Sequence, residues 1–299
     1  MALRKNLLLT VVTILSLFAF TALAFAQQQP APLKVMPLTG SVYWASGGAG
    51  SNTGFVVGRN GVVVIDAKMT VDSAKEFLVA IAKVTPKPVT HVILTHSDAD
   101  HVNGLAGFPA GLTIVATDKC KEEMEESANG PNPRMAAPKD YMPTQLVTKS
   151  KNITFDGVHL RLLHFAPAHT SGDLIVYLPD QKIVFTGDIV ALQTPYPIIH
   201  LEKHGSSEGW ITTMKGILAL NIDTVVPGHG DVQMGKEVLQ KRLADTEERR
   251  AKIQELVQQG KSLDEIKAVL GEPTAPAQGG GLRFPTFTEV VYQELTKKS

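Results

Sequence analysis

The stretch THSDADHVNG, residues 95–104, places two histidines and two aspartates within six positions, from His96 to His101. It follows the mostly apolar run HVILT, which we expect to form a β-strand. Because a strand fixes the start of the loop that follows it, His96, Asp98, Asp100 and His101 can be held on one side of that loop. Imidazole and carboxylate groups are common protein ligands of transition metals. This stretch therefore predicts a metal site at the end of a strand.

Three more candidate ligands stand at the ends of later expected strands, in the segments APAHTSGD, VFTGD and VVPGHG. They are His169, Asp188 and His229, and the gaps from His101 onward are 68, 19 and 41 residues. These gaps are too long for a local motif. Because each candidate follows a strand and sits in a turn, we expect all of them at a common edge of the sheets.

The chain between residues 33 and 229 alternates short β-rich runs with helical stretches, and it does so twice. This pattern predicts two sheets with helices outside, an α/β layered architecture. Residues 234–259 predict one long amphipathic helix that ends at Gly260. The segment GGAGSNTG, residues 47–54, lacks the Gly-Lys-Ser/Thr ending of a phosphate-binding loop and lies between strands, so it predicts a hairpin turn.

The N-terminus has the pattern of an export signal. A positive start, MALRK, precedes a long apolar run without charge, and AFA at residues 24–26 supplies a small-x-small cleavage pattern. We predict a signal peptide over residues 1–26, cleavage before Gln27, a periplasmic or secreted location, and no stable membrane association after cleavage. An uncleaved membrane anchor is the alternative, because the run is just long enough to span a bilayer.

Composition excludes some functions. Lys+Arg and Asp+Glu are both 29, so no basic excess exists to hold a phosphate backbone, and we expect no nucleic-acid partner. Cys120 is the single cysteine, so no intramolecular disulfide can form, and it is better interpreted as a partly buried thiol than as a nucleophile. We expect a small-molecule substrate, and a homo-oligomer is possible on this sequence.

The motifs IDA, THSDADHVNG, AHTSGD, FTGD and PGHG, in this order and spacing, resemble those of the metallo-β-lactamase superfamily. The resemblance extends to about residue 258. It implies a four-layer αββα sandwich over residues 33–258 with a two-metal centre along one edge of the sheets. Residues 259–299 would form a C-terminal helical extension.

The resemblance also implies which residues bind metal. The first metal would be held by His96, Asp98 and His169, the second by Asp100, His101 and His229, with Asp188 bridging the two. Asp100 would also be the catalytic residue, orienting a metal-bound hydroxide. Two Zn²⁺ ions are expected, with Fe or Mn as alternatives. Asp66 and Asp173 are interpreted as supporting residues rather than catalysts.

Asp98 departs from the family pattern, which has a second histidine at this position. With histidine, two carboxylates and one hydroxide face two dications and leave a charge of +1; Asp98 adds a third carboxylate and leaves the centre neutral. A neutral centre would be a poorer Lewis acid, and an oxygen ligand favours Fe or Mn over Zn. On this reasoning Asp98→His should raise zinc retention.

The sequence thus predicts an exported metal-dependent hydrolase that cleaves a small carbonyl substrate, a β-lactam, lactone, ester or thioester, by metal-bound hydroxide attack. Loops 46–53, 129–144 and 191–206 would form a mostly apolar mouth that suits a substrate with a carboxylate. Two alternatives stay open: an iron-dependent redox protein acting on oxygen or sulfur species, and a non-catalytic periplasmic metal-binding accessory protein. Five other histidines are interpreted as ordinary structural or surface residues: His91, His159, His164, His200 and His204.

Overall fold

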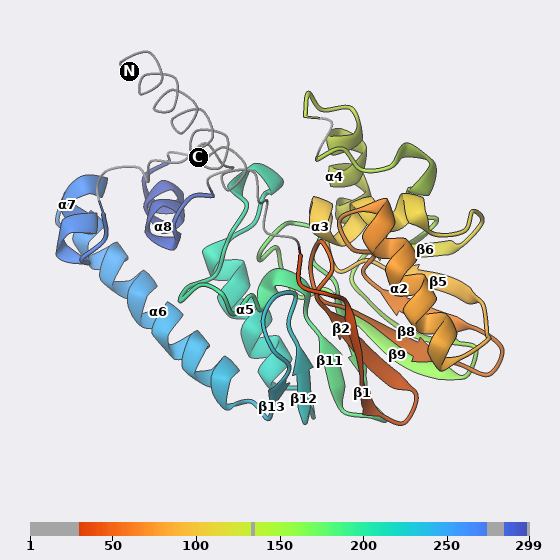
Figure 1. Cartoon of the computed structure of the whole chain (residues 1–299). Coiled ribbons are helices and arrows are strands. Elements are labelled where there is room, and N and C mark those ends of the chain that lie inside the picture. The colour runs from red at the N-terminus through yellow and green to blue at the C-terminus, as the bar shows by residue number, and fades with distance from the viewer. Residues whose placement is uncertain (1–29, 133–134, 274–283, 298–299) are drawn as a thin grey trace, which may run out of the picture. The chain divides into compact units, whose positions relative to one another are not determined.

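Two β-sheets, of seven and six strands, lie face to face at the centre of the computed structural model (Figure 1). The structure describes residues 30–132, 135–273 and 284–297, and Leu33 onward forms one compact unit. The predicted signal peptide, residues 1–26, lies outside the described residues. Within the described ranges, every helix is too short or too polar to cross a membrane.

The first sheet has its strands in sequence order. The early neighbours up to β4 pair antiparallel, and β4 to β7 pair parallel through helical crossovers. Its strands are β1 (Lys34–Thr39), β2 (Val42–Ser46), β3 (Thr53–Val57), β4 (Val62–Ile65), β5 (Val89–Ile93), β6 (Thr113–Thr117) and β7 (Gln145–Val147). The hairpin turn predicted at residues 47–54 is present as the connection of residues 47–52 between the antiparallel strands β2 and β3, and residues 53 and 54 already belong to β3.

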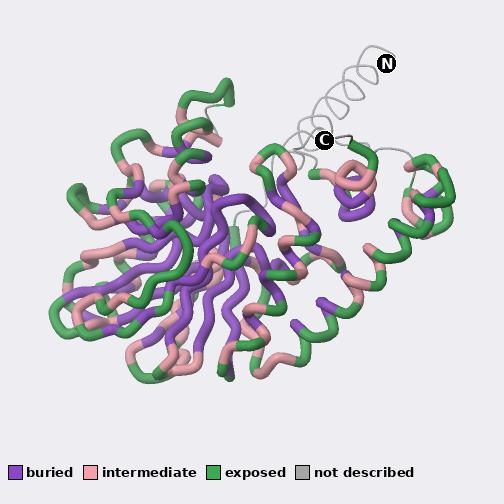
Figure 2. Tube along the Cα trace, turned by 180° about the vertical axis from the view of Figure 1, so that it is seen from behind, coloured by how far each residue is buried: buried purple, intermediate pink, exposed green. Residues whose placement is uncertain are grey.

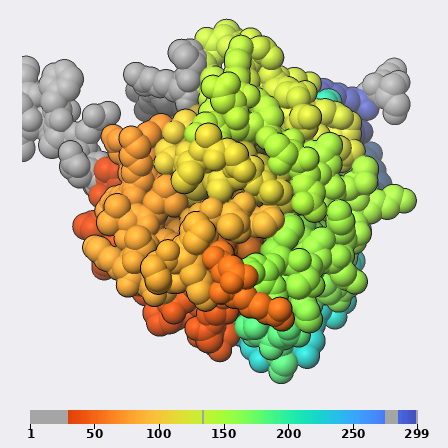
Figure 3. All heavy atoms as spheres, turned by 90° about the vertical axis from the view of Figure 1, so that its right-hand side faces the viewer, coloured from red at the N-terminus to blue at the C-terminus, as the bar shows by residue number. Residues whose placement is uncertain are grey.

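The second sheet has the order β13-β12-β11-β10-β9-β8, and only its β11–β12 pair is parallel. Its strands are β8 (Ser150–Phe155), β9 (Val158–Leu163), β10 (Ile175–Leu178), β11 (Ile183–Phe185), β12 (Thr224–Val226) and β13 (Gln233–Met234). In the space-filling view the orange to yellow residues of the first half lie directly against the green residues of the second (Figure 3).

Seven α-helices and four short 3₁₀ helices connect or cover these strands in the described ranges. The α-helices are α2 (Val71–Val84), α3 (Ala99–Val102), α4 (Asp118–Ala128), α5 (Ser207–Leu218), α6 (Glu237–Gln258), α7 (Leu263–Val269) and α8 (Phe287–Thr296). The 3₁₀ helices are η1 (Asn103–Gly107), η2 (Lys139–Tyr141), η3 (Gly187–Ile189) and η4 (Leu201–Lys203). The long helix predicted over 234–259 is α6, shortened at its start because β13 occupies Gln233–Met234.

The side chains of β4 point alternately to the two faces of the first sheet, and this explains why that sheet is covered by helices on one face and by the second sheet on the other. Val62 and Val64 face outward and pack in one apolar cluster with Phe77 of α2, while Val63 and Ile65 face the second sheet. Because successive strand residues point to opposite faces, a strand that is apolar on both faces needs a covering layer on each side. The backbone trace is accordingly buried along the strands and exposed along the outer helices (Figure 2). The predicted αββα sandwich is confirmed.

Helix α5 lies beside the second sheet, α6 and α8 pack on α5, and α7 packs on α6 and α8, so that all four helices form one apolar cluster with this sheet. Trp210 of α5 is fully buried there, and its indole Nε1 donates a hydrogen bond of 2.8 Å to the carbonyl of Ile189. The predicted C-terminal extension thus contributes to the core of the second half. The domain boundary between residues 258 and 259 stays a prediction.

Some elements could not be recognised from local pattern. The edge strands β1, β7 and β13 were not predicted; β7 and β13 have only three and two residues, and β1 is largely exposed. Such strands are defined by the neighbour they pair with rather than by their own apolar alternation. Helix α7 begins with a capping box formed by Ser262 and Glu265, with both of its hydrogen bonds present.

Candidate metal centre

All seven predicted ligands lie at one edge of the two sheets, in loops that follow strands. His96 and Asp98 follow β5, and Asp100 and His101 begin the short helix α3. The other three come from the second sheet: His169 from the β9–β10 loop, Asp188 from η3 after β11, and His229 from the loop after β12. The prediction that these segments meet at a common edge is confirmed.

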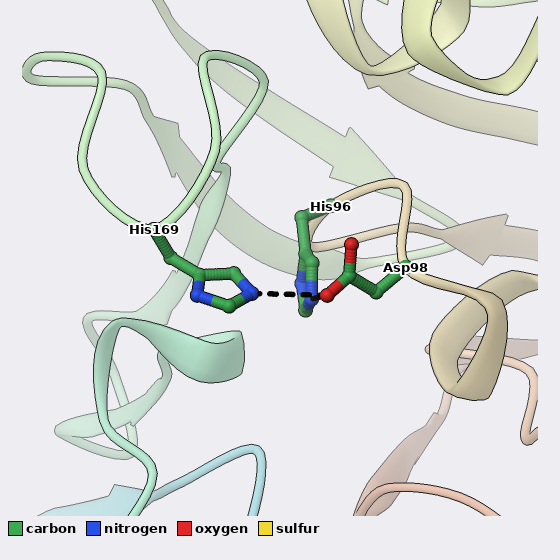
Figure 4. A group of neighbouring side chains, drawn as sticks. All are labelled: His96, Asp98 and His169. Carbon is green, nitrogen blue, oxygen red and sulfur yellow. Dashed lines mark hydrogen bonds and ion pairs between the residues drawn. The ribbon is translucent and has the colours of Figure 1, made fainter. Parts of the chain in front are cut away.

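The first cluster is centred on one oxygen of Asp98. Asp98 Oδ2 lies 3.1 Å from His169 Nε2 and 3.6 Å from His96 Nε2, and the three side chains face one another (Figure 4). They come from both halves of the sandwich. Their ligand atoms all lie within 4.8 Å of one another, a spacing that allows a single metal ion between them.

The second cluster lies beside the first. His229 Nε2 is 3.0 Å from Asp100 Oδ2 and 3.4 Å from Asp188 Oδ2, and His101 Nε2 is 3.2 Å from Asp188 Oδ1. The two oxygens of Asp188 therefore face two different histidines, and Asp188 also groups with His96. This position between the clusters is the one that a bridging carboxylate requires. The assignment of each ligand to a metal stays a prediction.

Supporting residues fix the orientation of these side chains. Asp66 accepts a hydrogen bond from His101 Nδ1 at 2.9 Å and two from Thr95, so His101 presents Nε2 to the centre. Asp173 accepts hydrogen bonds from the backbone N–H groups of Ala168 and Thr170, on either side of His169. Neither carboxylate has a place among the clustered ligand atoms. The interpretation of both as supporting residues agrees with these contacts.

The turn around Asp188 needs glycine. Gly187 has φ +52°, a left-handed conformation that favours glycine. A methyl group on Gly228 would overlap Asp188 Oδ1, because the backbone after β12 passes directly over this carboxylate. The FTGD and PGHG motifs thus use their glycines to bring Asp188 and His229 together.

The charges in the centre are strongly coupled. Burial lowers the pKa of His96 to about 4. Burial also acts to lower the pKa of His169, but the hydrogen bond and charge of Asp98 outweigh it and raise that pKa to about 10. Burial also acts to lower the pKa of His229, but its hydrogen bonds to Asp100 and Asp188 outweigh burial and raise that pKa to about 9. A metal ion therefore has to displace protons from His169 and His229 before these imidazoles can bind it.

Three buried polar atoms in the centre make no hydrogen bond of good geometry: His96 Nε2, His101 Nε2 and Asp188 Oδ1, although the last two lie only 3.2 Å apart. Buried polar atoms are normally paired, because an unpaired one costs about 1–3 kcal/mol. All three belong to one group whose ligand atoms lie within 4.8 Å. The residues present therefore fit a bound metal, which would pair with each of these atoms.

Two residues of the centre were missed. His200 was interpreted as ordinary, yet it is buried and its Nε2 lies 3.3 Å from Asp98 Oδ2. Lys203 was not considered as part of the centre, yet it places Nζ 2.6 Å from Asp98 Oδ1. His200 directly precedes η4 and Lys203 is its last residue, and no local pattern in this segment signals that the chain folds back to Asp98. His159, by contrast, is exposed and pairs with Asp180, away from the predicted ligands.

Lys203 also changes the charge count. The neutral centre deduced from sequence omitted this ammonium group, whose pKa is raised because Asp98 outweighs the effect of burial. When Lys203 is included, the net charge of two dications, one hydroxide, three carboxylates and this ammonium is +1, the same as for a centre with histidine at position 98. The charge count from sequence left out this buried cation, so the expectation for Asp98→His loses its electrostatic basis, while the effect of the substitution on zinc retention stays a prediction.

An apolar pocket of about 450 Å³ opens beside this loop. One wall is Tyr196, Pro197 and Ile198, and the other includes Phe284 and Phe287 of the C-terminal extension. It adjoins the centre at two points. The carbonyl of Ile198 accepts a hydrogen bond of 2.8 Å from His169 Nδ1, and the ring of Phe284 lies 4.7 Å from that of His200.

Comparison with known proteins agrees with this geometry. The sequence pattern of the Metallo-beta-lactamase superfamily matches residues 46–229, more than half of the chain. The chain belongs to this superfamily. The resemblance inferred from the motifs is thereby confirmed, and membership implies a binuclear metal centre.

The relatives in this superfamily have diverse names. A "Linear primary-alkylsulfatase" of Pseudomonas sp. is 21% identical over 62% of this chain and 42% of its own. A "Metallo-beta-lactamase type 2" of Bacillus cereus is 27% identical over 62% of this chain and 70% of its own. The "2,4-dinitroanisole O-demethylase subunit alpha" of Nocardioides sp. is 28% identical over 64% and 56%. This chain therefore spans less than half the length of the alkylsulfatase.

Solved structures show the same fold. The sec-alkyl sulfatase Pisa1 from Pseudomonas sp. superposes with a TM-score of 0.66 at 18% identity, over 89% of this chain and 50% of its own. A metallo-beta-lactamase from Pontibacter korlensis superposes with a TM-score of 0.60 at 20% identity, over 72% of this chain and 99% of its own. At these identities the likeness concerns the fold alone.

Proposed function

We propose that this member of the metallo-beta-lactamase superfamily is an exported metal-dependent hydrolase that cleaves a small carbonyl compound, a β-lactam, lactone, ester or thioester. The observation that carries the proposal is the cluster of buried imidazole and carboxylate groups with unpaired atoms directed at one another. When bound there, metal ions supply a Lewis acid for the carbonyl oxygen and acidify a water molecule.

The chain's own residues position the reactants. Asp100 is the most exposed carboxylate of the set, with 28% of its side chain accessible, so it can reach a substrate or a water molecule. We assign it the role of orienting the attacking water and accepting its proton. In the metal-free protein His229 Nε2 lies 3.0 Å from Asp100 Oδ2 and orients the Asp100 carboxylate. Asp66 keeps His101 turned toward the centre.

The apolar pocket supports a substrate with an apolar substituent. Its volume of about 450 Å³ lies in the range typical of small-molecule sites. Because Phe284 touches His200 and Ile198 touches His169, an apolar group in the pocket would leave its carbonyl near the centre. Relatives named for β-lactam and alkyl sulfate cleavage support the hydrolytic class, not a particular substrate.

Two Zn²⁺ ions are the proposed occupants, with Fe or Mn as alternatives. The all-nitrogen and oxygen ligand set suits each of these metals. Lys203 weakens the case for iron, because it offsets the extra negative charge of Asp98. Metal content measured on protein purified from the periplasm without added metal distinguishes about two zinc ions per chain from iron.

Asp100→Asn tests the hydrolase directly. We expect kcat/KM on a panel of lactams, lactones and thioesters to fall by about 10²–10⁴-fold, because an amide cannot accept the proton. Because Asp100 is also a predicted ligand of the second metal, metal content is measured in parallel, and the activities are compared at metal concentrations that load the variant to the wild-type level. Unchanged activity in this variant, or a metal-loaded wild type inert on every member of the panel, would refute the proposal.

Location and association are proposed from sequence. Export predicts that intact protein from the periplasmic fraction has a mass that begins at Gln27. A mass that includes Met1 in the membrane fraction would instead indicate an uncleaved anchor. A homo-oligomer is a further proposal, and light scattering of the purified protein would test it.

A further inference from the structure

We propose that Lys203 is a positioning residue that makes Asp98 equivalent in charge to a neutral histidine ligand, so that the two residues function as a matched pair. The proposal rests on the metal centre of the proposed function. It concerns metal binding, however, and can be tested without any substrate.

The two oxygens of Asp98 have different partners. Oδ1 accepts a hydrogen bond of 2.6 Å from Lys203 Nζ, whereas Oδ2 faces the Nε2 atoms of three histidines, His96, His169 and His200. Asp98 is the N-cap residue of α3, but its side chain makes no capping hydrogen bond. An aspartate at a helix N-cap usually bonds the free backbone N–H groups of the first turn. Here the carboxylate is directed at Lys203 and the histidines, so only Oδ2 is left for a metal.

Hydrogen bonds fix both the side-chain ammonium and the backbone carbonyl of Lys203. Its Nζ also donates to Ser97 Oγ at 2.9 Å, and Ser97 in turn donates to Glu123 Oε2 at 2.6 Å. The other Glu123 oxygen accepts hydrogen bonds from the backbone and hydroxyl of Ser171, whose N–H group also bonds the carbonyl of Lys203. The ammonium therefore cannot swing away from Asp98 without breaking a buried network.

The electrostatic attraction between Asp98 and Lys203 determines what happens when either residue is replaced. Asp98 has only 12% and Lys203 only 21% of its side chain exposed, so water screens their attraction weakly. Replacing Asp98 by histidine keeps a metal-binding nitrogen but removes the carboxylate that directly contacts the Lys203 cation. Lys203 then keeps only Ser97 and, through it, Glu123, and a buried cation that has lost its direct ion-pair partner beside a dication is costly. Removing the lysine at the same time removes the repulsion and recreates the histidine version of the site.

The test is a double-mutant cycle on metal affinity. Wild type, Asp98→His, Lys203→Met and the double variant are titrated with Co²⁺ against a chelator, and the absorption spectrum of bound Co²⁺ reports the ligand set. We expect Asp98→His to weaken the first metal by about 10- to 100-fold. The double variant should return to within about threefold of wild type.

A matched control uses Lys121, an α4 lysine that pairs with Glu125 on the surface. Asp98→His combined with Lys121→Met should stay as weak as Asp98→His alone. If Asp98→His binds Co²⁺ as tightly as wild type, or if Lys203→Met gives no rescue, the pairing is refuted.

Lys203→Met by itself provides a second test if Asp98→His fails to fold. It frees Oδ1, so Asp98 can bind Co²⁺ through both oxygens and the Co²⁺ absorption bands should shift, whereas Lys121→Met leaves them unchanged. Identical spectra for Lys203→Met and wild type would overturn the proposal. All these readouts need no turnover, so a failure of the matched pair is distinct from a failure of the hydrolase assignment.

Discussion

Asp173, which supports the metal centre, also makes the free energy of unfolding depend on pH. It is almost fully buried, and its carboxylate holds the backbone around His169 through bonds to Ala168 and Thr170. Burial raises the pKa of Asp173 from 3.8 to about 6. Between these values the native state keeps a proton that the unfolded state has released. The contribution of Asp173 to the free energy of unfolding therefore falls as pH rises through this range.

The pH dependence of Asp173→Asn tests this linkage. In metal-free protein, the free energy of unfolding of wild type minus that of the variant should fall by about 3 kcal/mol between about pH 4 and pH 6.5. Urea titrations at several pH values provide the measurement. Asp180→Asn, at a surface position with 60% of the side chain exposed, is the control and should show no such trend. A difference that is constant with pH contradicts the prediction.

At the scale of elements, a buried ion pair joins the two last helices. Lys267 of α7 lies 2.6 Å from Glu289 of α8, and 6% and 11% of their side chains are exposed. Removing one member of such a pair leaves an uncompensated charge in the core, whereas replacing both is often nearly neutral. The pair therefore fixes how α7 and α8 pack more than it adds to net stability.

We predict that Lys267→Ala lowers the free energy of unfolding by about 3–5 kcal/mol. The double change Lys267→Met with Glu289→Gln should recover at least half of the loss, since glutamine can still complete the capping box of α8. Lys252, paired with Glu255 on the exposed face of α6, gives the control: its alanine variant should cost less than about 1 kcal/mol. Denaturant unfolding measures all three, and equal losses in the single and double variants would rule the argument out.

At the scale of the whole molecule, the centre joins the two halves of the sandwich. His96, Asp98, Asp100 and His101 follow a strand of the first sheet, and the other ligands come from loops of the second. A metal ion bound by both sets stabilises only the folded chain, because the unfolded chain does not bring them together.

Metal removal should therefore lower the midpoint of thermal unfolding. At a free zinc concentration about 1,000 times Kd, we expect the free energy of unfolding to exceed that of chelator-treated protein by about 4 kcal/mol. Unfolding monitored by fluorescence measures this difference and the accompanying shift of the midpoint. A variant with His169→Ala and His229→Ala should lose most of this gain. Equal midpoints with and without chelator would show that no metal links the two halves.

The sequence by itself determined the layered fold and the seven candidate ligands. Strand alternation requires a cover on each face of each sheet, and ligands at strand ends must meet where those strands end. THSDADHVNG, AHTSGD, FTGD and PGHG each contain their chemistry within a few residues, so local pattern was enough to find them.

Only the tertiary structure decided what surrounds Asp98. Lys203 is 105 residues away along the chain, in a loop without a recognisable motif, and the same loop brings His200 to the centre. Their contacts depend on how the loop after η3 folds back across the sheet edge, which no local pattern specifies. For this reason the charge of the centre, unlike its candidate ligands, could not be derived from the sequence, because a buried ammonium adds to that charge only where the fold places it.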